Sequence, residues 1–228
     1  MFQELLTAIQ LLVTFDPELW GIIGVTLRVA VTSTALAAII ALPVGIWFGL
    51  TDFPGRRWLD AGLNAMLALP TVAVGLLVYL ALSRHGPLGG LELLFTPTAI
   101  ILGQIILALP VIAIMVSNAV RGADPRILPT ALSLGATTGQ SHRLLMRETK
   151  GLILLSVAAG FGRVVAEIGS AMLVGGNIRG KTRTLTTAVS LMTSQGEFAR
   201  AMALVIVLMV IVLGINLLLY RATHRGRA

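Results

Sequence analysis

The sequence predicts an all-α membrane protein with five transmembrane helices. Three observations predict this class: 56% of the 228 residues are hydrophobic, only 12% are charged, and several apolar runs are long enough to cross a bilayer. Soluble domains carry about a quarter charged residues, so the deficit indicates that lipid is part of the solvent. The chain has no cysteine, which excludes disulfides, thiolate metal sites and thiol catalysis.

A helix needs about 20 apolar residues to cross the hydrocarbon core. Five segments meet this requirement, and they comprise residues 22–50, 61–82, 97–120, 151–174 and 198–220. Residues 2–15 are shorter and place apolar side chains at helical spacing, which predicts an amphipathic helix on the membrane surface. Residues 184–192 are short and rich in Thr and Ser, so we expect a helix packed inside the bundle or at its outer mouth.

The distribution of Lys and Arg predicts the orientation. Connections 51–60 and 121–150 and the C-terminal tail together carry ten basic residues, against four in the N-terminal segment and connections 83–96 and 175–197. Cytoplasmic connections are enriched in basic residues, so the N-terminus is expected outside and the C-terminus inside. The alternative is a six-span form in which the N-terminal helix joins a crossing.

The predicted organisation has three parts, which are an N-terminal amphipathic segment (1–18), a transmembrane domain (19–221) and a basic cytoplasmic tail (222–228). Within the spans, Pro43, Pro70 and Pro110 each remove a helix hydrogen bond and permit a kink. Gly45 and Gly49 form a small-xxx-small pair that allows close helix approach. Ordinary packing accounts for each of these residues alone, and together they favour bent helices around a path.

Connection 121–150 contains a short apolar helix that ends near Gly135, because Gly is favoured just after a helix C-terminus. Such a helix on the water side of a membrane needs to bury its apolar face. Docking on a soluble partner and folding back on the bundle both meet this need. The residues concerned are Ile127, Leu128, Pro129, Thr130, Ala131, Leu132, Ser133, Leu134, Gly135 and Ala136.

This segment resembles the coupling loop of ABC-importer permeases, whose pattern is Glu-Ala-Ala, three residues and Gly, followed nine residues later by Ile-x-Leu-Pro. Ala131 and Gly135 match the pattern. Pro129 and Thr130 stand where Glu and Ala are expected, and residues 145–148 read Leu-Met-Arg-Glu. The missing Glu puts in doubt the polar contact that it would make with the ATPase.

The resemblance extends over residues 20–220. Residues 53–56 with 69–75 are similar to molybdate-type permeases, whereas residues 160–188 and 193–198 look more like the tungstate branch. The resemblance implies a type I ABC importer permease fold in a bacterial or archaeal inner membrane. It also implies a homodimer, two ATPase subunits that dock on the coupling helix and hold ATP and Mg, and an extracytoplasmic oxyanion-binding protein.

On this basis we expect import of an oxyanion, tungstate in the first place, with molybdate or sulfate as the alternative. The chain itself is expected to carry no catalytic residue, no cofactor, no metal site and no nucleic-acid partner. A membrane enzyme or self-contained nucleotide-binding protein, and an ATP-independent channel or carrier, are the alternatives from other classes. The sequence lacks the repeated halves typical of many carriers.

Two charged residues of the fourth span, Arg163 and Glu167, are four apart and are expected to share a helix face. Charges at membrane depth are costly and face the bundle interior. Because an Arg matched by a Glu attracts an anion poorly, a structural or gating role is favoured over lining the path. The full set of pathway or gate candidates is Arg163, Glu167, Gly169, Ser170, Asn64, Pro70, Thr71 and Gln104.

Residues 175–182 match the phosphate-loop pattern G-x-x-x-x-G-K-[ST]. A phosphate loop follows a strand, whereas this segment follows a membrane helix, so we expect no nucleotide binding. The charge distribution places the segment outside the cell. Its basic residues Arg179, Lys181 and Arg183 are expected either to steer an anion from the outer face or to contact a delivery protein.

Overall fold

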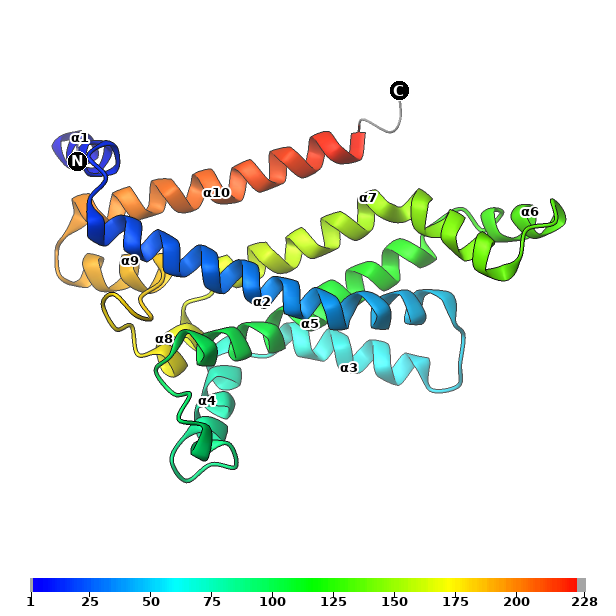
Figure 1. Ribbon diagram of the computed structural model, residues 1–228, viewed down its shortest axis with the longest axis horizontal. Helices are drawn as coiled ribbons and strands as arrows, with labels where there is room; N and C mark the ends of the chain where they lie inside the picture. The colour runs from blue at the N-terminus through cyan, green and yellow to red at the C-terminus, as the bar shows by residue number, and fades with distance from the viewer. Residues whose placement is uncertain (1, 225–228) are drawn as a thin grey trace.

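The computed structural model describes residues 2–224, which form ten α-helices and one short 3-10 helix in an elongated bundle (Figure 1). The elements are α1 (Phe2–Val13), α2 (Pro17–Leu50), α3 (Arg56–Ala68), α4 (Thr71–Leu82), η1 (Gly89–Leu91), α5 (Pro97–Arg121), α6 (Ile127–Ser133), α7 (Thr138–Val165), α8 (Gly169–Gly175), α9 (Leu185–Ser194) and α10 (Phe198–His224). In Figure 1, α1 and α9 lie at one end of the molecule and α6 at the other. We refer to these as the α9 end and the α6 end.

Helices α2, α5 and α10 are long and apolar enough to cross a membrane. Two further crossings are possible if each bent pair counts as one, since α3 and α4 meet at 93° and α7 and α8 at 60°. The chain therefore has three to five candidate spans by length and composition. The 34 residues of α2 extend about 50 Å, which exceeds the roughly 30 Å hydrocarbon core and requires tilt or extension beyond it.

The segments 61–82 and 151–174, predicted as spans, are each divided into two helices. Pro70 has no N–H to donate, and the residue before a proline is driven out of the helical region, as the ψ of 132° at Leu69 shows. Pro43 and Pro110, by contrast, lie within continuous helices. The break at 166–168 contains no proline and has a different cause, described below.

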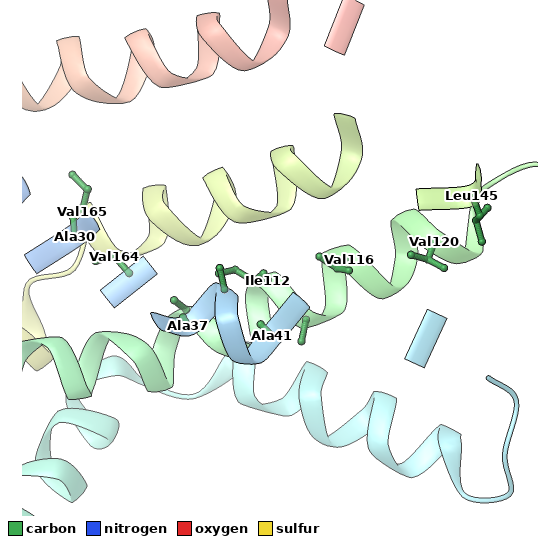
Figure 2. Close-up of a cluster of buried hydrophobic side chains, with 12 residues drawn as sticks. Ala30, Ala37, Ala41, Ile112, Val116, Val120, Leu145, Val164 and Val165 are labelled. Carbon is green, nitrogen blue, oxygen red and sulfur yellow. The ribbon is translucent and has the colours of Figure 1, made fainter. Parts of the chain in front are cut away.

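The main core lies where α2, α5 and α7 meet, with Ala37, Ile112 and Val164 among its buried side chains (Figure 2). The Gly45 and Gly49 pair brings α2 against α5 here. A Cβ at Gly45 would lie 2.6 Å from the Ala113 carbonyl oxygen, and one at Gly49 would lie 2.5 Å from Val120 Cβ. These glycines therefore permit a close approach of α2 to α5.

A second core at the α9 end joins α1, α2, α9 and α10, where Ala8, Leu19, Leu185 and Leu204 are buried. The predicted helix at 184–192 is confirmed as α9, and it packs inside the bundle. The predicted N-terminal helix is confirmed as α1, whose outward face leaves Leu6 and Val13 exposed. The tail residues 225–228 lie outside the described residues.

Candidate functional site

Helix α6 presents two different faces at the α6 end. Ile127 and Leu128 are half-buried against the main core, and Ala131 is buried, so one face folds back on the chain's own bundle. On the other face, Leu132 is 50% exposed and Leu134 is 82% exposed. The sequence left two alternatives open for this helix, folding back on the bundle and docking on a partner. One face folds back on the bundle, and the exposed face is available to another chain.

Both ends of α6 are held by local hydrogen bonds. The Gly135 N–H donates to the Leu132 carbonyl and the Ala136 N–H to the Ala131 carbonyl, both at 3.0 Å, with Gly135 at a φ of +86°. This pattern is a Schellman motif, in which Gly adopts the left-handed conformation without a Cβ penalty. Leu134 is therefore presented on a helix end of defined geometry.

At the start of α6, the Arg126 backbone N–H donates to the Asp124 carboxylate at 2.9 Å. The Arg126 guanidinium donates to the same carboxylate at 2.8 Å and lowers the pKa of Asp124 to about 2. The helix begins at Ile127, two residues after Pro125.

The break between α7 and α8 is organised by Glu167. One carboxylate oxygen accepts from Arg163 Nη1 at 3.0 Å, and the other accepts from the Ser170 N–H at 3.0 Å. The Glu167 carbonyl accepts from the Thr186 hydroxyl at 2.7 Å. Helix α7 ends at Val165, and the prediction that Arg163 and Glu167 share a helix is therefore wrong, although the ion pair forms.

The breaks of the two bent pairs lie side by side. A Cβ at Gly169 would lie 2.7 Å from Val72 Cγ2 and 3.3 Å from Thr71 Oγ1. Pro70 immediately precedes Thr71, so the structure gathers Pro70, Thr71, Glu167, Gly169 and Ser170 at one junction of the chain. We call this the break junction.

The predicted pathway residue Asn64 is placed apart from the break junction. It lies on the exposed side of α3, and its side-chain amide donates to the Asp60 carbonyl at 2.7 Å. Gln104 of α5 is only 2% exposed, and its Oε1 has no hydrogen-bond partner.

Gln104 lines a small cavity whose other polar members are Thr26, Glu167, Thr184 and Thr186, beside six apolar residues of α2, α5, α7 and α8. Its volume of about 10 Å³ is close to the minimum for one water and excludes an anion of several heavy atoms. Sequence reasoning missed Thr26, whose hydroxyl accepts from the Leu185 N–H at 2.8 Å, because a lone Thr in an apolar helix gives no signal of its partner.

The basic residues at the α9 end are organised around one carboxylate that the sequence did not reveal. Glu18, in the first turn of α2, receives Arg179 Nη2 at 2.5 Å and Arg183 Nη1 at 3.2 Å. Arg200 Nη1 lies 3.7 Å away. Arg183 is largely buried, whereas Lys181 is exposed. We call these residues of α2, α10 and the 176–184 loop the Glu18 cluster.

The geometry of residues 175–182 is not that of a phosphate loop. The N–H groups of Lys181, Thr182 and Arg183 all donate to the Ile178 carbonyl, at 3.0–3.1 Å. The Thr182 hydroxyl donates to the Gly175 carbonyl at 2.6 Å. A phosphate loop follows a strand, whereas helix α8 leads into this segment. The backbone amides that would cradle a phosphate are instead used in hydrogen bonds within the segment.

Bent and broken apolar helices and a partly uncovered helix at one end are compatible with a membrane transport subunit. The sequence matches the family described as "Binding-protein-dependent transport system inner membrane component" over residues 41–225, and the chain belongs to this family. It is thus a multi-pass inner-membrane permease subunit of an ABC importer, and its part is transport rather than catalysis. Membership implies ATPase and binding-protein partners, with ATP bound by the ATPase.

Several relatives are similar over most of their length. The tungstate uptake system permease protein TupB of Peptoclostridium acidaminophilum is 38% identical over 213 residues, covering 93% of both chains. TupB of Campylobacter jejuni is 38% identical over 97% of this chain and 92% of its own. A probable anion ABC transporter permease of Haloferax volcanii is 39% identical over 87% and 88%.

Solved structures confirm the fold. A chain from inward-facing conformations of the MetNI methionine ABC transporter aligns with a TM-score of 0.74, at 22% identity, covering 93% of this chain and 99% of that one. A chain from an amino acid ABC transporter structure with histidines aligns with a TM-score of 0.72, at 18% identity, covering 94% and 96%. An all-helical ABC permease fold with three to five candidate spans is thus confirmed.

Proposed function

We propose that this chain forms the membrane path of an importer for tungstate. The observation that carries the substrate is the 38% identity, over 93% and 97% of this chain, to two permeases of tungstate uptake systems. Molybdate is the alternative, supported by 30% identity over 76% of the chain to the molybdenum permease ModB of Escherichia coli. Sulfate is supported less, by 28% identity over 68% of the chain to a probable sulfate transport system permease protein of Nephroselmis olivacea.

We infer five spans, with the N-terminus outside and the C-terminus inside. The basic loop with α6 and the loop 176–184 lie at opposite ends of the molecule, as the charge distribution requires (Figure 1). Aromatic pairs also mark both ends of α2: Phe15 stacks on Trp20 at 4.9 Å, and Trp47 on Phe53 at 5.3 Å. Such rings concentrate at membrane–water interfaces, which supports a bilayer bounded by these two pairs. We keep the divisions 1–18, 19–221 and 222–228 as part of this proposal, although α2 begins at Pro17 and α10 continues to His224.

We further propose that α6 is the dock for the partner ATPase, to which ATP and Mg belong. The uncovered Leu132 and Leu134 supply an apolar contact, and the buried Ala131 fixes the helix on α7. Movement of the ATPase subunits would then be transmitted to α7 through this short helix.

A second copy of the chain is proposed to cover α3 and its junction with α4. Residues 64–70 are all exposed, and they include Asn64 and the unwound backbone at Leu69 and Pro70. Non-helical backbone and polar side chains at membrane depth are tolerated only where protein or a water-filled path covers them. A path between two copies, lined on this side by Asn64, satisfies that condition. Thr71 and Ser170 lie just beyond it at the break junction.

At the α9 end, we propose that Lys181 meets the oxyanion or its delivery protein. Arg179 and Arg183 already share the Glu18 carboxylate, which reduces their attraction for a free anion. Their positive excess over Glu18 still favours an acidic partner surface. The Arg163–Glu167 pair is assigned to gating or to holding the helices, since both charges are matched.

The proposal is tested by tungstate uptake in cells that lack their own tungstate and molybdate importers. The chain is expressed with its ATPase and binding protein, and intracellular tungsten is measured by mass spectrometry. We expect uptake that requires ATP hydrolysis and is unaffected by excess sulfate. Preferential uptake of molybdate or sulfate would reassign the substrate, and uptake that persists with an inactive ATPase would refute the importer.

A further inference from the structure

A groove at the α9 end runs between α2 and the 176–184 loop. Its volume is about 280 Å³, and its two walls differ in chemistry. Gly21, Ile22 and Val25 form an apolar wall on α2, whereas Arg179 and Arg183 bring guanidinium groups from the loop. We call it the α2 groove. A groove with one apolar and one cationic wall suits a molecule that is itself partly apolar and partly anionic.

The arginines of the α2 groove keep hydrogen-bond donors for a further anion, since a guanidinium has five N–H groups. Arg179 gives Nη2 to Glu18, yet its side chain is 70% exposed. Arg183 gives Nη1 to the same carboxylate, and its buried Nε has no hydrogen-bond partner among the described residues. With Arg200, three arginines in the Glu18 cluster face two carboxylates, those of Glu18 and Glu197. The positive charge at this end is therefore not fully matched.

Arg28 continues the same face of α2 into the membrane. Gly21, Val25 and Arg28 are spaced i, i+4 and i+7, so Arg28 follows the groove on the next turn of the helix. The helix rises about 12 Å from Trp20, at the proposed interface, to Arg28. The Arg28 side chain is exposed and makes no ion pair within the described part of the chain. An unpaired charge at membrane depth is costly, which indicates that an anion meets it there.

The spanning helices offer no free carboxylate to Arg28, from this chain or from a second copy. In their described residues at the α9 end, the acids are Glu18 and, at the break between α7 and α8, Glu167. Both carboxylates already bind arginines of their own chain. A long arginine side chain on a helix can extend towards the helix N-terminus, which here is the direction of the interface and the groove. The anion that fits is thus one that the bilayer itself supplies.

We propose that the α2 groove binds an anionic phospholipid of the leaflet at the α9 end. Arg179 and Arg183 hold the phosphate, Arg28 approaches it from the bilayer side, and the glycerol and first acyl carbons cover the apolar wall. A zwitterionic lipid binds less well, because its ammonium group meets the unmatched positive charge. A free anion gains nothing from the apolar wall. Lys181 does not line the groove, so the partner proposed for it above is unaffected. Binding of this lipid requires only that the chain lies in a membrane, whatever anion it transports.

The lipid site is tested on the full-length chain purified in detergent. Native mass spectrometry measures binding during titration with phosphatidylglycerol or with phosphatidylcholine of identical acyl chains. We expect tighter binding of phosphatidylglycerol, and Arg28→Gln should lower that affinity about fivefold without changing the affinity for phosphatidylcholine. Arg200→Gln is the matched control, because it removes the same charge from the same cluster but does not line the groove. Its effect should stay below about twofold.

A second variant fills the groove without changing any charge. The Cβ position of Gly21 has no neighbouring atom within 4 Å, so Gly21→Leu is compatible with the fold and occupies space that the lipid needs. It should also lower the affinity for phosphatidylglycerol. Gly214→Leu, at an equally open position of α10 away from the groove, should leave the affinity unchanged. Circular dichroism verifies that each variant is folded.

Three outcomes would overturn the lipid site. The first is equal affinity of the unmodified chain for the two lipids. The second is an unchanged affinity for phosphatidylglycerol in both Arg28→Gln and Gly21→Leu. The third is binding of inorganic phosphate that depends on Arg28 but is insensitive to Gly21→Leu, which would assign the groove to a free anion instead.

Discussion

Arg163 and Glu167 form a 3.0 Å ion pair across a helix end, because α7 stops at Val165 and Glu167 lies in the break that follows. The Arg163 side chain is 32% exposed and that of Glu167 only 3%. The buried carboxylate also binds the first turn of α8, so the pair connects a long helix to a short one. This geometry favours a holding or latching role over direct contact with a passing anion.

We predict that Arg163→Ala abolishes uptake and also lowers the stability of the protein in the membrane. The change leaves the buried Glu167 carboxylate without its cationic partner, and loss of one partner of a buried pair is strongly unfavourable. Uptake and quantitative immunoblotting measure the two effects. Arg163→Lys, which keeps the charge, should retain part of the activity. Normal uptake by Arg163→Ala at a normal protein level would contradict the assignment.

Gly135→Ala is expected to weaken the association with the ATPase several-fold. An alanine at a φ of +86° costs about 1 kcal/mol in the left-handed region, so the Schellman end of α6 is disfavoured. Co-purification of the ATPase measures the change. Gly139→Ala is the control, since Gly139 lies in the first turn of α7 with open space at its Cβ position. Equal effects of the two substitutions would exclude a role for the helix end.

Leu134→Glu is expected to abolish coupling between ATP hydrolysis and uptake without destabilising the chain. The side chain is 82% exposed, so the substitution leaves the fold unchanged but puts a charge on the proposed apolar dock. Melting temperature and ATPase binding are measured together. Leu88→Glu, at an exposed leucine beyond α4, should leave binding intact. Retained ATPase binding by Leu134→Glu would place the dock elsewhere.

We predict that the affinity for the ATPase shows no titration step from the Asp124–Arg126 contact between about pH 5 and pH 8. Asp124 has a pKa lowered to about 2, so it stays ionised throughout that range. Because the folded-state pKa is depressed, its stabilising contribution is present above the ordinary value of 3.8 and is lost as the pH falls towards 2. Binding affinity is measured against pH. A step near neutral pH that disappears in Asp124→Asn would disprove this.

In the Glu18 cluster, Lys181→Ala and Arg183→Ala should have different effects. Arg183 is largely buried and binds Glu18, so its loss should lower the melting temperature. Lys181 is exposed, so its loss should leave stability unchanged and slow uptake only at low ionic strength, where steering is unscreened. Melting curves and salt-dependent uptake separate the two. A salt-independent loss of uptake in Lys181→Ala would argue against steering.

Much of the architecture was predictable because lipid imposes simple rules on sequence. Apolar length identified α2, α5 and α10, and the Thr-rich composition of 184–192 predicted α9 as a helix inside the bundle or at its outer mouth. The glycine that ends α6 was predictable because few other residues adopt its conformation. The phosphate-loop pattern was correctly set aside, since a membrane helix precedes it.

The breaks and the pairings were less predictable. Proline signalled a break at residue 70 but not at 43 or 110, because surrounding contacts decide whether a helix tolerates the missing hydrogen bond. At the break, the Glu167 carbonyl accepts a hydrogen bond from the hydroxyl of Thr186, a residue 19 positions away. No local pattern reports such a partner.

The sequence by itself determined the class of solvent, the candidate spans, the distribution of charge and the presence of a short helix at 127–133. Only the tertiary structure decided that Glu18 binds the basic loop, that two helix breaks share one junction, and which face of α6 remains uncovered. Composition and periodicity depend on each residue's own transfer free energy and helical position. Pairings between distant residues depend on how the helices pack, which no single segment encodes.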